Sequence, residues 1–450
     1  MQAIQEYADA LRYIYSFADY ERQTPRQHAF QHLENVRALL HAVGNPHTQL
    51  RAIHVTGTKG KGSTTAMLTS VLATAGNRVG TFTSPHLNTH RERYRLDGQP
   101  VSETLFTSML RELQPAIERV RSERPLTTFE VSTALAFTLF LRERVDWAVV
   151  EVGLGGRLDT TNVIIPALSV ITSISLDHTQ VLGDTIELIA ADKAGIIKPG
   201  APVVVSPQRA EALKPIREQA QRVGSPVIEV ERVARPLDRV IVNPLRQEFT
   251  LDTSLELGGE PLHGCRVGLN LQGVHQVENA LTAIAALSSL DPAAAGVRTA
   301  DLLKGMERVS WPGRFEVVEG GVPVVLDGAH NPYSMRKLRQ AVEEVFPGQR
   351  ACYVFASGRR HDAGEMLREL KGLPVVLCSS THPQSRSTAE LAALAEAEGF
   401  QYQTATSVPE AIAIARQERA QLVVVCGTLF LVADAREALG LAEATDPVRS

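Results

Sequence analysis

Residues 53–65, IHVTGTKGKGSTT, bring together the residue types needed to hold a phosphate. A β-branched run leads into three closely spaced glycines, which allow positive φ angles and close backbone approach to a ligand: Gly57, Gly60 and Gly62. A helix-forming segment follows, and the free amides at a helix N-terminus attract anions. Lys61 would place its ammonium on the β- and γ-phosphates of a nucleotide. The segment therefore predicts a phosphate loop.

The hydroxyls that follow the glycines, Ser63 and Thr64, are placed to reach a Mg²⁺ ion bound to the same phosphates. The spacing departs from the general phosphate-loop pattern, because two residues instead of four separate the first two glycines. Gly62 also stands between the lysine and the serine. The alternative interpretation is a tight strand–helix turn with a solvated lysine.

Polar side chains follow other predicted strands, where open α/β sheets place their ligand sites. They are Ser84 after a strand at 78–82, Glu151 at the end of an apolar strand, His178 after Asp177, and Lys193 in an otherwise apolar helical turn. A carboxylate that ends such a strand is costly unless it binds a metal or pairs with a charge. Together with a phosphate loop, these groups predict oxygen ligands for Mg²⁺, among which the histidine is the least natural.

Each of these four residues also has an ordinary structural interpretation. Ser84 could cap a helix, and Glu151 could pair with Arg157. His178 could be a hydrogen-bonded core histidine, and Lys193 could lie on a solvated helix face.

A second group of polar residues lies on both sides of a break in the chain at 305–316. Asn279 lies near the start of a helix in LQGVHQVENA and could bond a base or a phosphate. Arg314 in WPGRFE suits bidentate phosphate contact. Asp327 ends a strand in VVLDGAHNP and His330 follows it. A nucleotide bound between two domains would bring these residues together on closure, although a turn asparagine, a surface arginine and an N-cap aspartate explain them equally well.

Short apolar runs alternate with helical patterns along most of the chain. The predicted strands, besides 78–82, are 51–56, 146–151, 168–174, 202–206, 323–327, 351–356, 374–379 and 421–426. The predicted helices are 3–17, 30–43, 62–75, 102–121, 128–143, 184–194, 275–288, 331–345 and 407–417. This alternation predicts an α/β fold with mostly parallel sheets.

Two segments interrupt the alternation. Residues 227–270 are rich in β-formers, glycine and proline and predict a small antiparallel appendage. Trp311-Pro312-Gly313 ends a helical pattern and marks a domain boundary. We therefore expect a large phosphate-loop ATPase domain at 1–308 and a smaller, Rossmann-like C-terminal α/β domain at 309–450.

The composition excludes several classes of protein. The chain has 450 residues, a net charge of -4 and 44% hydrophobic residues, which is unlike a disordered chain or a general nucleic-acid binder. No apolar run reaches the roughly 18 residues that span a bilayer, and the first residues lack the pattern of a signal peptide. The four cysteines are far apart without a C-x-x-C pair, so we expect reduced thiols in a cytoplasmic protein.

Taken in order, the motifs resemble the folylpolyglutamate synthase/dihydrofolate synthase family of the Mur ligase superfamily. The resemblance runs from about Tyr7 to Leu431 and is carried by VTGTKGKGST, TSPHL, TTFE, EVGLGGRLDTTN, ITSISLDH with LGDT, KAGIIK, HQVENA, WPGRFE, LDGAHNP, SSTHPQSRS and CGTLFL. It implies ATP-driven amide ligation, in which a substrate carboxylate attacks the γ-phosphate and the amine of L-glutamate captures the acyl phosphate. The C-terminal domain would bind glutamate and complete the ATP site.

The resemblance also implies roles for individual residues. ATP would contact Gly57, Thr58, Gly60, Lys61, Gly62, Ser63, Thr64, Asn279, Arg314 and Asp327. The Mg²⁺ ligands would be Ser84, Glu151, His178 and an N-carboxylated Lys193. The folate or pteroate would contact Thr127, Thr128, Phe129, Glu130, Leu158, Asp159 and Thr160. The catalytic residues would be Lys61, Lys193, Asp327 and His330.

Three positions depart from the family's pattern. Lys59 stands where asparagine is usual and adds charge near the phosphates. Thr160 replaces the more common alanine in the pterin region, and Arg360-His361-Asp362 replaces a DKD-like segment.

Several alternatives remain open at this point. The cell-wall ligases of the superfamily carry a further domain before the phosphate loop, for which residues 1–56 leave little room. Dihydrofolate synthase activity alone, or a Mur-type amide ligase that acts on another carboxylate, is possible. A phosphate-loop kinase or NTPase would explain 53–65 but not the second domain, and a nucleotide-dependent scaffold would not explain the polar strand ends. We expect small-molecule substrates, no nucleic-acid or membrane partner, and a monomer.

Overall fold

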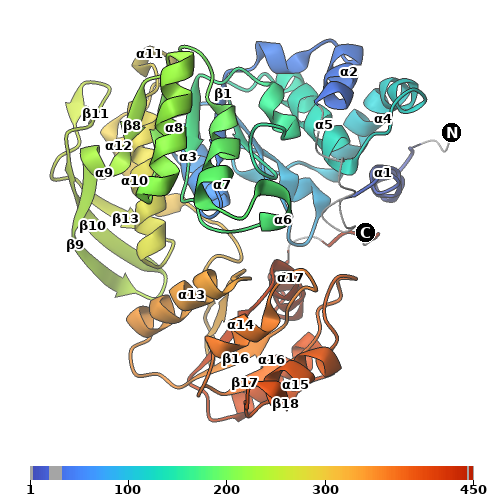
Figure 1. Cartoon of the computed structure of the whole chain (residues 1–450), viewed down its shortest axis with the longest axis vertical. Coiled ribbons are helices and arrows are strands. Elements are labelled where there is room, and N and C mark those ends of the chain that lie inside the picture. The colour runs from blue at the N-terminus through green and yellow to red at the C-terminus, as the bar shows by residue number, and fades with distance from the viewer. Residues whose placement is uncertain (1–3, 20–32, 443–444, 449–450) are drawn as a thin grey trace.

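The computed structural model describes residues 4–19, 33–442 and 445–448. It forms a large domain and a smaller C-terminal domain, each built around its own sheet (Figure 1). The sheet of the large domain has the order β4-β3-β2-β5-β1-β6-β7-β8, in which β3 and β4 are antiparallel and the other strands are parallel. Its strands are β1 (Ala52–Thr56), β2 (Val79–Phe82), β3 (Tyr94–Leu96), β4 (Gln99–Pro100), β5 (Trp147–Glu151), β6 (Leu168–Ile171), β7 (Val203–Val205) and β8 (Val227–Glu229).

Helices cover both faces of this sheet, which explains why its central strands are apolar on both sides. One face packs on α3 (Lys61–Thr74), α10 (Val274–Ser288) and α12 (Thr299–Arg308). The other packs on α1 (Tyr7–Ile14), α2 (Glu34–Ala42), α4 (Glu103–Arg121) and α5 (Thr128–Arg142). At the β7–β8 end lie α6 (Thr179–Leu182), α7 (Ile186–Lys193) and α8 (Ala210–Val223).

An antiparallel appendage follows the large sheet, but it begins later than the sequence pattern predicts. Residues 227–229 form β8, which pairs in parallel with β7 as an edge strand of the large sheet. The prediction of 227 as the start was therefore wrong, because this run continues the α/β alternation. The appendage contains α9 (Val230–Val233), β9 (Ala234–Asn243), β10 (Arg246–Thr253), β11 (Glu256–Leu257), β12 (Glu260–Pro261) and β13 (Arg266–Leu269).

The C-terminal domain has a six-stranded sheet of order β14-β15-β19-β16-β17-β18, with only β14 antiparallel. Its strands are β14 (Glu316–Val318), β15 (Val324–Leu326), β16 (Ala351–Phe355), β17 (Val375–Leu377), β18 (Gln403–Thr404) and β19 (Leu422–Cys426). Its helices are α13 (Pro332–Val345), α14 (Ala363–Arg368), α15 (Thr388–Ala397), α16 (Val408–Gln417) and α17 (Leu429–Ala438). The sheet has a separate apolar core on each face.

These elements confirm the predicted α/β class. Every predicted strand is present, and the strands missing from the prediction are two or three residues long: β3, β4, β8, β14 and β18. The predicted helix 30–43 appears as α2 from Glu34, while its residues 30–32 lie outside the described part of the chain. Among the described helices, none is both long and apolar enough to cross a bilayer.

Residues 445–448, which the structure describes near the end of the chain, return to the large domain, where Asp446 contacts Tyr7 of α1. The buried carboxylate of Asp446 accepts hydrogen bonds from Tyr7 Oη at 2.6 Å, Thr89 Oγ1 at 2.7 Å and the His90 amide at 2.8 Å. The loop that contains Thr89 and His90 also contacts α17, because the Nδ2 of the preceding Asn88 donates to the Ala433 carbonyl at 3.0 Å. The tail thus joins the last helix of the C-terminal domain to the large domain.

Asp446→Ala should lower the free energy of unfolding by about 1–3 kcal/mol, because it leaves several buried donors without their acceptor. Urea denaturation would measure the loss, and Glu218→Ala on the exposed side of α8 is the control. Equal losses in the two variants would contradict a role for the tail carboxylate.

Candidate functional site

The predicted phosphate loop lies between β1 and α3, and its glycines are sterically required. Gly57 and Gly60 have φ angles of +152° and +88°. A Cβ at Gly57 would collide with Thr172 Oγ1, and one at Gly60 would collide with Asn279 Oδ1. The N-cap residue of α3 is Gly60, which has no side chain to cap the first turn, so the amides of that turn are suited to bind an anion. The structure therefore brings Asn279 of α10 against the loop.

Two lysines converge beneath the loop. Lys61 Nζ lies 3.1 Å from the Gly57 carbonyl oxygen, and Lys193 Nζ donates to the same oxygen at 2.8 Å. Lys193, at the end of α7, is only 3% exposed, which excludes the solvated-face interpretation. Burial, reinforced by the charge of Lys61, lowers the pKa of Lys193 to about 7. Two amines that share one carbonyl oxygen concentrate basic groups at one point, which suits a highly charged anion.

Glu151 lies at the end of β5, beside Ser84 in the loop that follows β2. Its carboxylate is buried and accepts one hydrogen bond, at 3.3 Å from the Ser84 amide, among the residues that the structure describes. Burial raises the pKa of Glu151 to about 7, against the opposing effect of Lys61. The Arg157 side chain donates instead to the Ala191 carbonyl. A buried carboxylate with so little hydrogen bonding fits a hard cation such as Mg²⁺.

His178 is placed differently from the other predicted metal ligands. It begins α6 with a φ of +49°, and its side chain is 56% exposed, with Nε2 3.9 Å from Asp177 Oδ1. Burial lowers the pKa of His178, against the opposing effect of Asp177. Within the described ranges, no three histidine, cysteine or acidic side chains form a metal-binding cluster.

The pKa of Glu151 predicts how stability depends on pH. It lies above the ordinary 4.5, so the folded protein retains the proton longer and loses stability as pH rises between these values. Glu151→Gln should therefore be more stable than the wild type at about pH 8, by roughly 1–3 kcal/mol. The difference should disappear below about pH 5. Urea denaturation at both pH values tests this, with the exposed Glu211→Gln as control; a pH-independent difference would contradict it.

Arg314 and Asp327 meet at the connection between the domains. Asp327 is partly buried and accepts hydrogen bonds from the Phe315 and Ala329 amides, both at 2.8 Å. Burial raises its pKa, and Arg314 is the main opposing influence. Gly328 allows the guanidinium of Arg314 to approach, because a Cβ there would collide with Nη1. Asp327 thus fixes the backbone beside Arg314.

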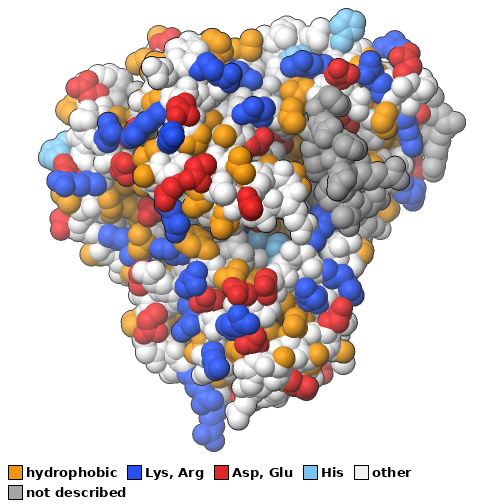
Figure 2. Space-filling model, viewed as in Figure 1, with side chains coloured by type: hydrophobic (Ala, Val, Ile, Leu, Met, Phe, Trp, Pro, Cys, Tyr) orange, Lys and Arg blue, Asp and Glu red, His pale blue; other side chains and the backbone are white. Residues whose placement is uncertain are grey.

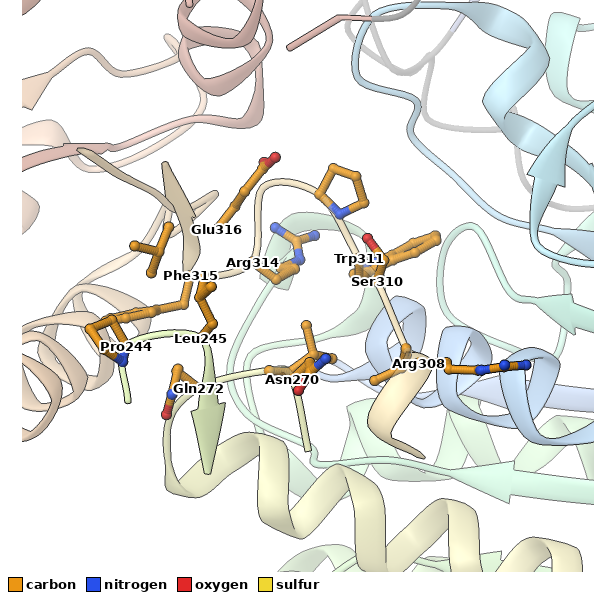
Figure 3. Close-up of a pocket in the computed structure, with 14 residues that line it drawn as sticks. Pro244, Leu245, Asn270, Gln272, Arg308, Ser310, Trp311, Arg314, Phe315 and Glu316 are labelled. Atoms are coloured by element: carbon orange, nitrogen blue, oxygen red, sulfur yellow. The ribbon is translucent and has the colours of Figure 1, made fainter. Parts of the chain in front are cut away.

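A cavity of about 270 Å³ opens beside this connection (Figure 3). It is lined by Trp311, Arg314, Phe315 and polar residues including Asn270 and Gln272. The Trp311 ring also lies close to Gly62 of the phosphate loop. The cavity is therefore adjacent to the loop, although Lys61, Lys193 and Glu151 do not line it.

His330 of the C-terminal domain reaches the phosphate loop. Lys59 Nζ lies 3.0 Å from His330 Nε2 and 2.8 Å from Asp177 Oδ2. The His361 ring lies beside that of His330, with 5.1 Å between the ring centroids. Figure 2 shows histidine side chains in the hollow between the two domains. The sequence marked Lys59 and His361 only as departures from a pattern and gave no signal that Lys59 contacts His330.

The residues predicted to bind folate occupy two neighbouring segments. In the first, Thr127 and Glu130 form a capping box at the start of α5, and Thr128 Oγ1 donates to the carbonyls of Ile14 and Phe17. The partly exposed Phe129 ring fills the space above Gly153.

In the second segment, Asp159 is buried and accepts hydrogen bonds from the Leu154 and Thr161 amides, both at 2.9 Å. Thr160 Oγ1 lies 2.6 Å from Thr133 Oγ1 on α5, while the Leu158 side chain is 41% exposed. The acidic and threonine groups thus organise the backbone of both segments, and the side chains available to a ligand are mainly apolar.

The comparisons with known proteins agree with this arrangement. The Mur ligase middle domain matches residues 55–287, and the Mur ligase, glutamate ligase domain matches residues 313–429. Dihydrofolate synthase/folylpolyglutamate synthase of Bacillus subtilis is 34% identical over 90% of this chain and 94% of its own. Folylpolyglutamate synthase of Lacticaseibacillus casei is 33% identical over 76% and 77% of the two chains.

Solved structures show the same likeness. Mycobacterium tuberculosis folylpolyglutamate synthase with ADP and AMPPCP superposes with a TM-score of 0.86 and 28% identity, over 98% of this chain and 100% of that chain. An FPGS–AMPPCP–folate complex gives 0.81 and 29% over 97% and 100%. The chain therefore belongs to the folylpolyglutamate synthase/dihydrofolate synthase family of amide-bond-forming Mur ligases.

Proposed function

We propose that this protein ligates L-glutamate to the carboxylate of a folate or a pteroate, with ATP converted to ADP and phosphate. The observation that carries the proposal is the pair of amines, from Lys61 and Lys193, that meet at the Gly57 carbonyl beside the buried Glu151. Two relatives whose names include folylpolyglutamate synthase, and a relative bound to AMPPCP and folate, support the choice of substrates.

In this proposal the triphosphate lies along the amides of residues 57–63, and the Lys61 ammonium neutralises part of its charge, while Lys193 would carry the carbamate that supports Mg²⁺. The nucleoside occupies the cavity beside Trp311, with Arg314 at its phosphate end. Phosphoryl transfer to a carboxylate needs positioning and charge neutralisation rather than a protein nucleophile. The substrate carboxylate attacks the γ-phosphorus and displaces ADP, and the glutamate amine then attacks the acyl carbon and displaces phosphate.

Glu151 would hold Mg²⁺ together with Ser84, whose amide donates to its carboxylate, and His178. The ion would neutralise the phosphate oxygens when bound. We place the pteroyl group against Phe129 and Leu158, whose apolar surfaces are available to it. Glutamate would enter from the C-terminal domain, beside His330 and His361. All of these residues belong to one chain, so we propose a monomer as the active species.

Phosphate release from ATP tests the reaction. It should require both an acceptor and L-glutamate, and D-glutamate should not replace the L-isomer. Phosphate release with acceptor but without glutamate would instead favour a kinase or NTPase. Mass spectrometry of products from dihydropteroate and from a reduced folate identifies the acceptor, since each ligation adds one glutamyl residue. We expect products from both, because the Bacillus subtilis relative is named for both activities.

A further inference from the structure

Lys59 is the phosphate-loop residue whose side chain leaves the loop. Its backbone amide donates to the Ser173 carbonyl at 3.1 Å, which fixes the residue between Gly57 and Gly60. Its side chain, by contrast, extends across the hollow between the domains to His330. The backbone of Lys59 is therefore held in the phosphate loop, while its side chain is bonded to the C-terminal domain.

The chemistry of this contact is determined by the groups around it. His330 Nδ1 lies 2.8 Å from the Gly328 carbonyl oxygen, which can only accept, so Nδ1 carries the proton and Nε2 presents its lone pair. The Lys59 ammonium donates to that lone pair and to the Asp177 carboxylate. Its side chain is only 20% exposed, so this charged hydrogen-bonded bridge is shielded from water.

A second ion pair between the domains provides a comparison. Arg239 Nη2 lies 2.9 Å from Glu344 Oε2, between β9 of the appendage and α13. It joins the same two domains but involves no phosphate-loop residue. The Lys59 bridge is thus distinguished by its place in the loop, only two residues from Lys61.

We infer that Lys59 is a positioning residue for the ligation: its bridge to Asp177 and His330 sets the C-terminal domain over the phosphate loop, so that glutamate meets the acyl phosphate. The kinetic part of this inference rests on the proposed function. The bridge itself does not, since it exists in the protein without substrates. A misplacement of the incoming amine by about 1 Å is enough to slow such a reaction by about 100-fold.

The test compares Lys59→Met, which removes the charge, with Lys59→Arg, which keeps a cation, and with Arg239→Met as the matched control. We expect Lys59→Met to lower kcat by about 10- to 100-fold, with KM for ATP changed by less than about threefold. Lys59→Arg should recover much of the loss. Arg239→Met should retain the wild-type kcat.

A distance measurement supplies the second readout. Spin labels at Glu218→Cys on α8 and Ala393→Cys on α15, both exposed, report the separation of the domains without substrates. Cys265 is replaced by serine in this background because it is the one partly exposed cysteine in the described chain. Lys59→Met should broaden the distance distribution and lengthen its mean, while Lys59→Arg should restore it.

Each other result overturns the inference. A lower kcat with an unchanged distance distribution would mean that Lys59 acts directly on the phosphates. A changed distribution with wild-type kcat would mean that the bridge does not position the reaction, and equal losses in Arg239→Met would remove any special role for the loop. If the wild type shows no glutamate-dependent phosphate release, the proposed function fails. An unchanged distribution in Lys59→Met would then still refute the bridge.

Discussion

Lys61→Ala is expected to lower kcat for glutamate-dependent phosphate release by about 100- to 1000-fold, the usual cost of losing one charge-stabilising group in an active site. Lys61 Nζ lies at the base of the glycine loop, 3.1 Å from the Gly57 carbonyl, and is placed to turn towards a phosphate. The loop backbone should remain folded, because Thr172 Oγ1 donates to the Lys59 carbonyl and the Thr58 amide donates to the Ser173 carbonyl, both at 2.8 Å.

Steady-state phosphate release with saturating acceptor and glutamate measures this loss. The exposed Lys214→Ala on α8 is the control and should behave as the wild type. A Lys61→Ala enzyme with kcat within about threefold of the wild type would place Lys61 outside the reaction.

Lys193→Ala is expected to cause a second large loss, about 100-fold in kcat, which a short carboxylate partly reverses. Lys193 is buried, its amine is held at 2.8 Å by the Gly57 carbonyl, and its pKa is lowered to about 7. A neutral amine attacks CO₂ through its lone pair, forms an N–C bond and loses one proton. The resulting carbamate would place negative charge beside the Mg²⁺ site.

Acetate should therefore restore part of the activity of Lys193→Ala, because the shortened side chain leaves room for it. Lys193→Met is the matched control, since its side chain fills the same space and should prevent rescue. A carbamate signal from ¹³C-bicarbonate, present in the wild type and absent from both variants, is independent of turnover. A fully active Lys193→Ala enzyme would refute the assignment.

The sequence predicts the site well where polar residues lie at the ends of neighbouring parallel strands, because those strands end at the same edge of the sheet. Ser84 and Glu151 come after β2 and β5, which are neighbours in the sheet, so the hydrogen bond between them follows from the topology. For Lys193 the sequence left both a polar site and a solvated helix face open, and its 3% exposure in the structure decides against the solvated face. The inference for Ser84 and Glu151 needs only the strand pattern and the rule that such strands end at one edge.

Side-chain direction and tertiary support could not be predicted in the same way. His178 is adjacent to Asp177 in sequence, yet its side chain is 56% exposed, while the Asp177 carboxylate bonds Lys59. Thr172, which crowds Gly57, directly follows β6 within the ITSISLDH segment, but nothing in that segment indicates a contact with Gly57. The bridge from Lys59 to His330 joins residues 271 positions apart, and no local pattern encodes such a separation.

The C-terminal tail has a consequence for how the cleft opens. The C-terminal domain is attached to the large domain at its beginning by the backbone around Trp311 and at its end by Asp446, which accepts hydrogen bonds from Tyr7 and Thr89. Once the side-chain contacts of Lys59 and Arg239 with the C-terminal domain open, these two attachments leave a rotation about the line that joins them as the least restricted movement of the domain. The C-terminal domain would therefore open by a hinge rotation. Substrates would enter and products would leave on the side of the cleft opposite the hinge axis.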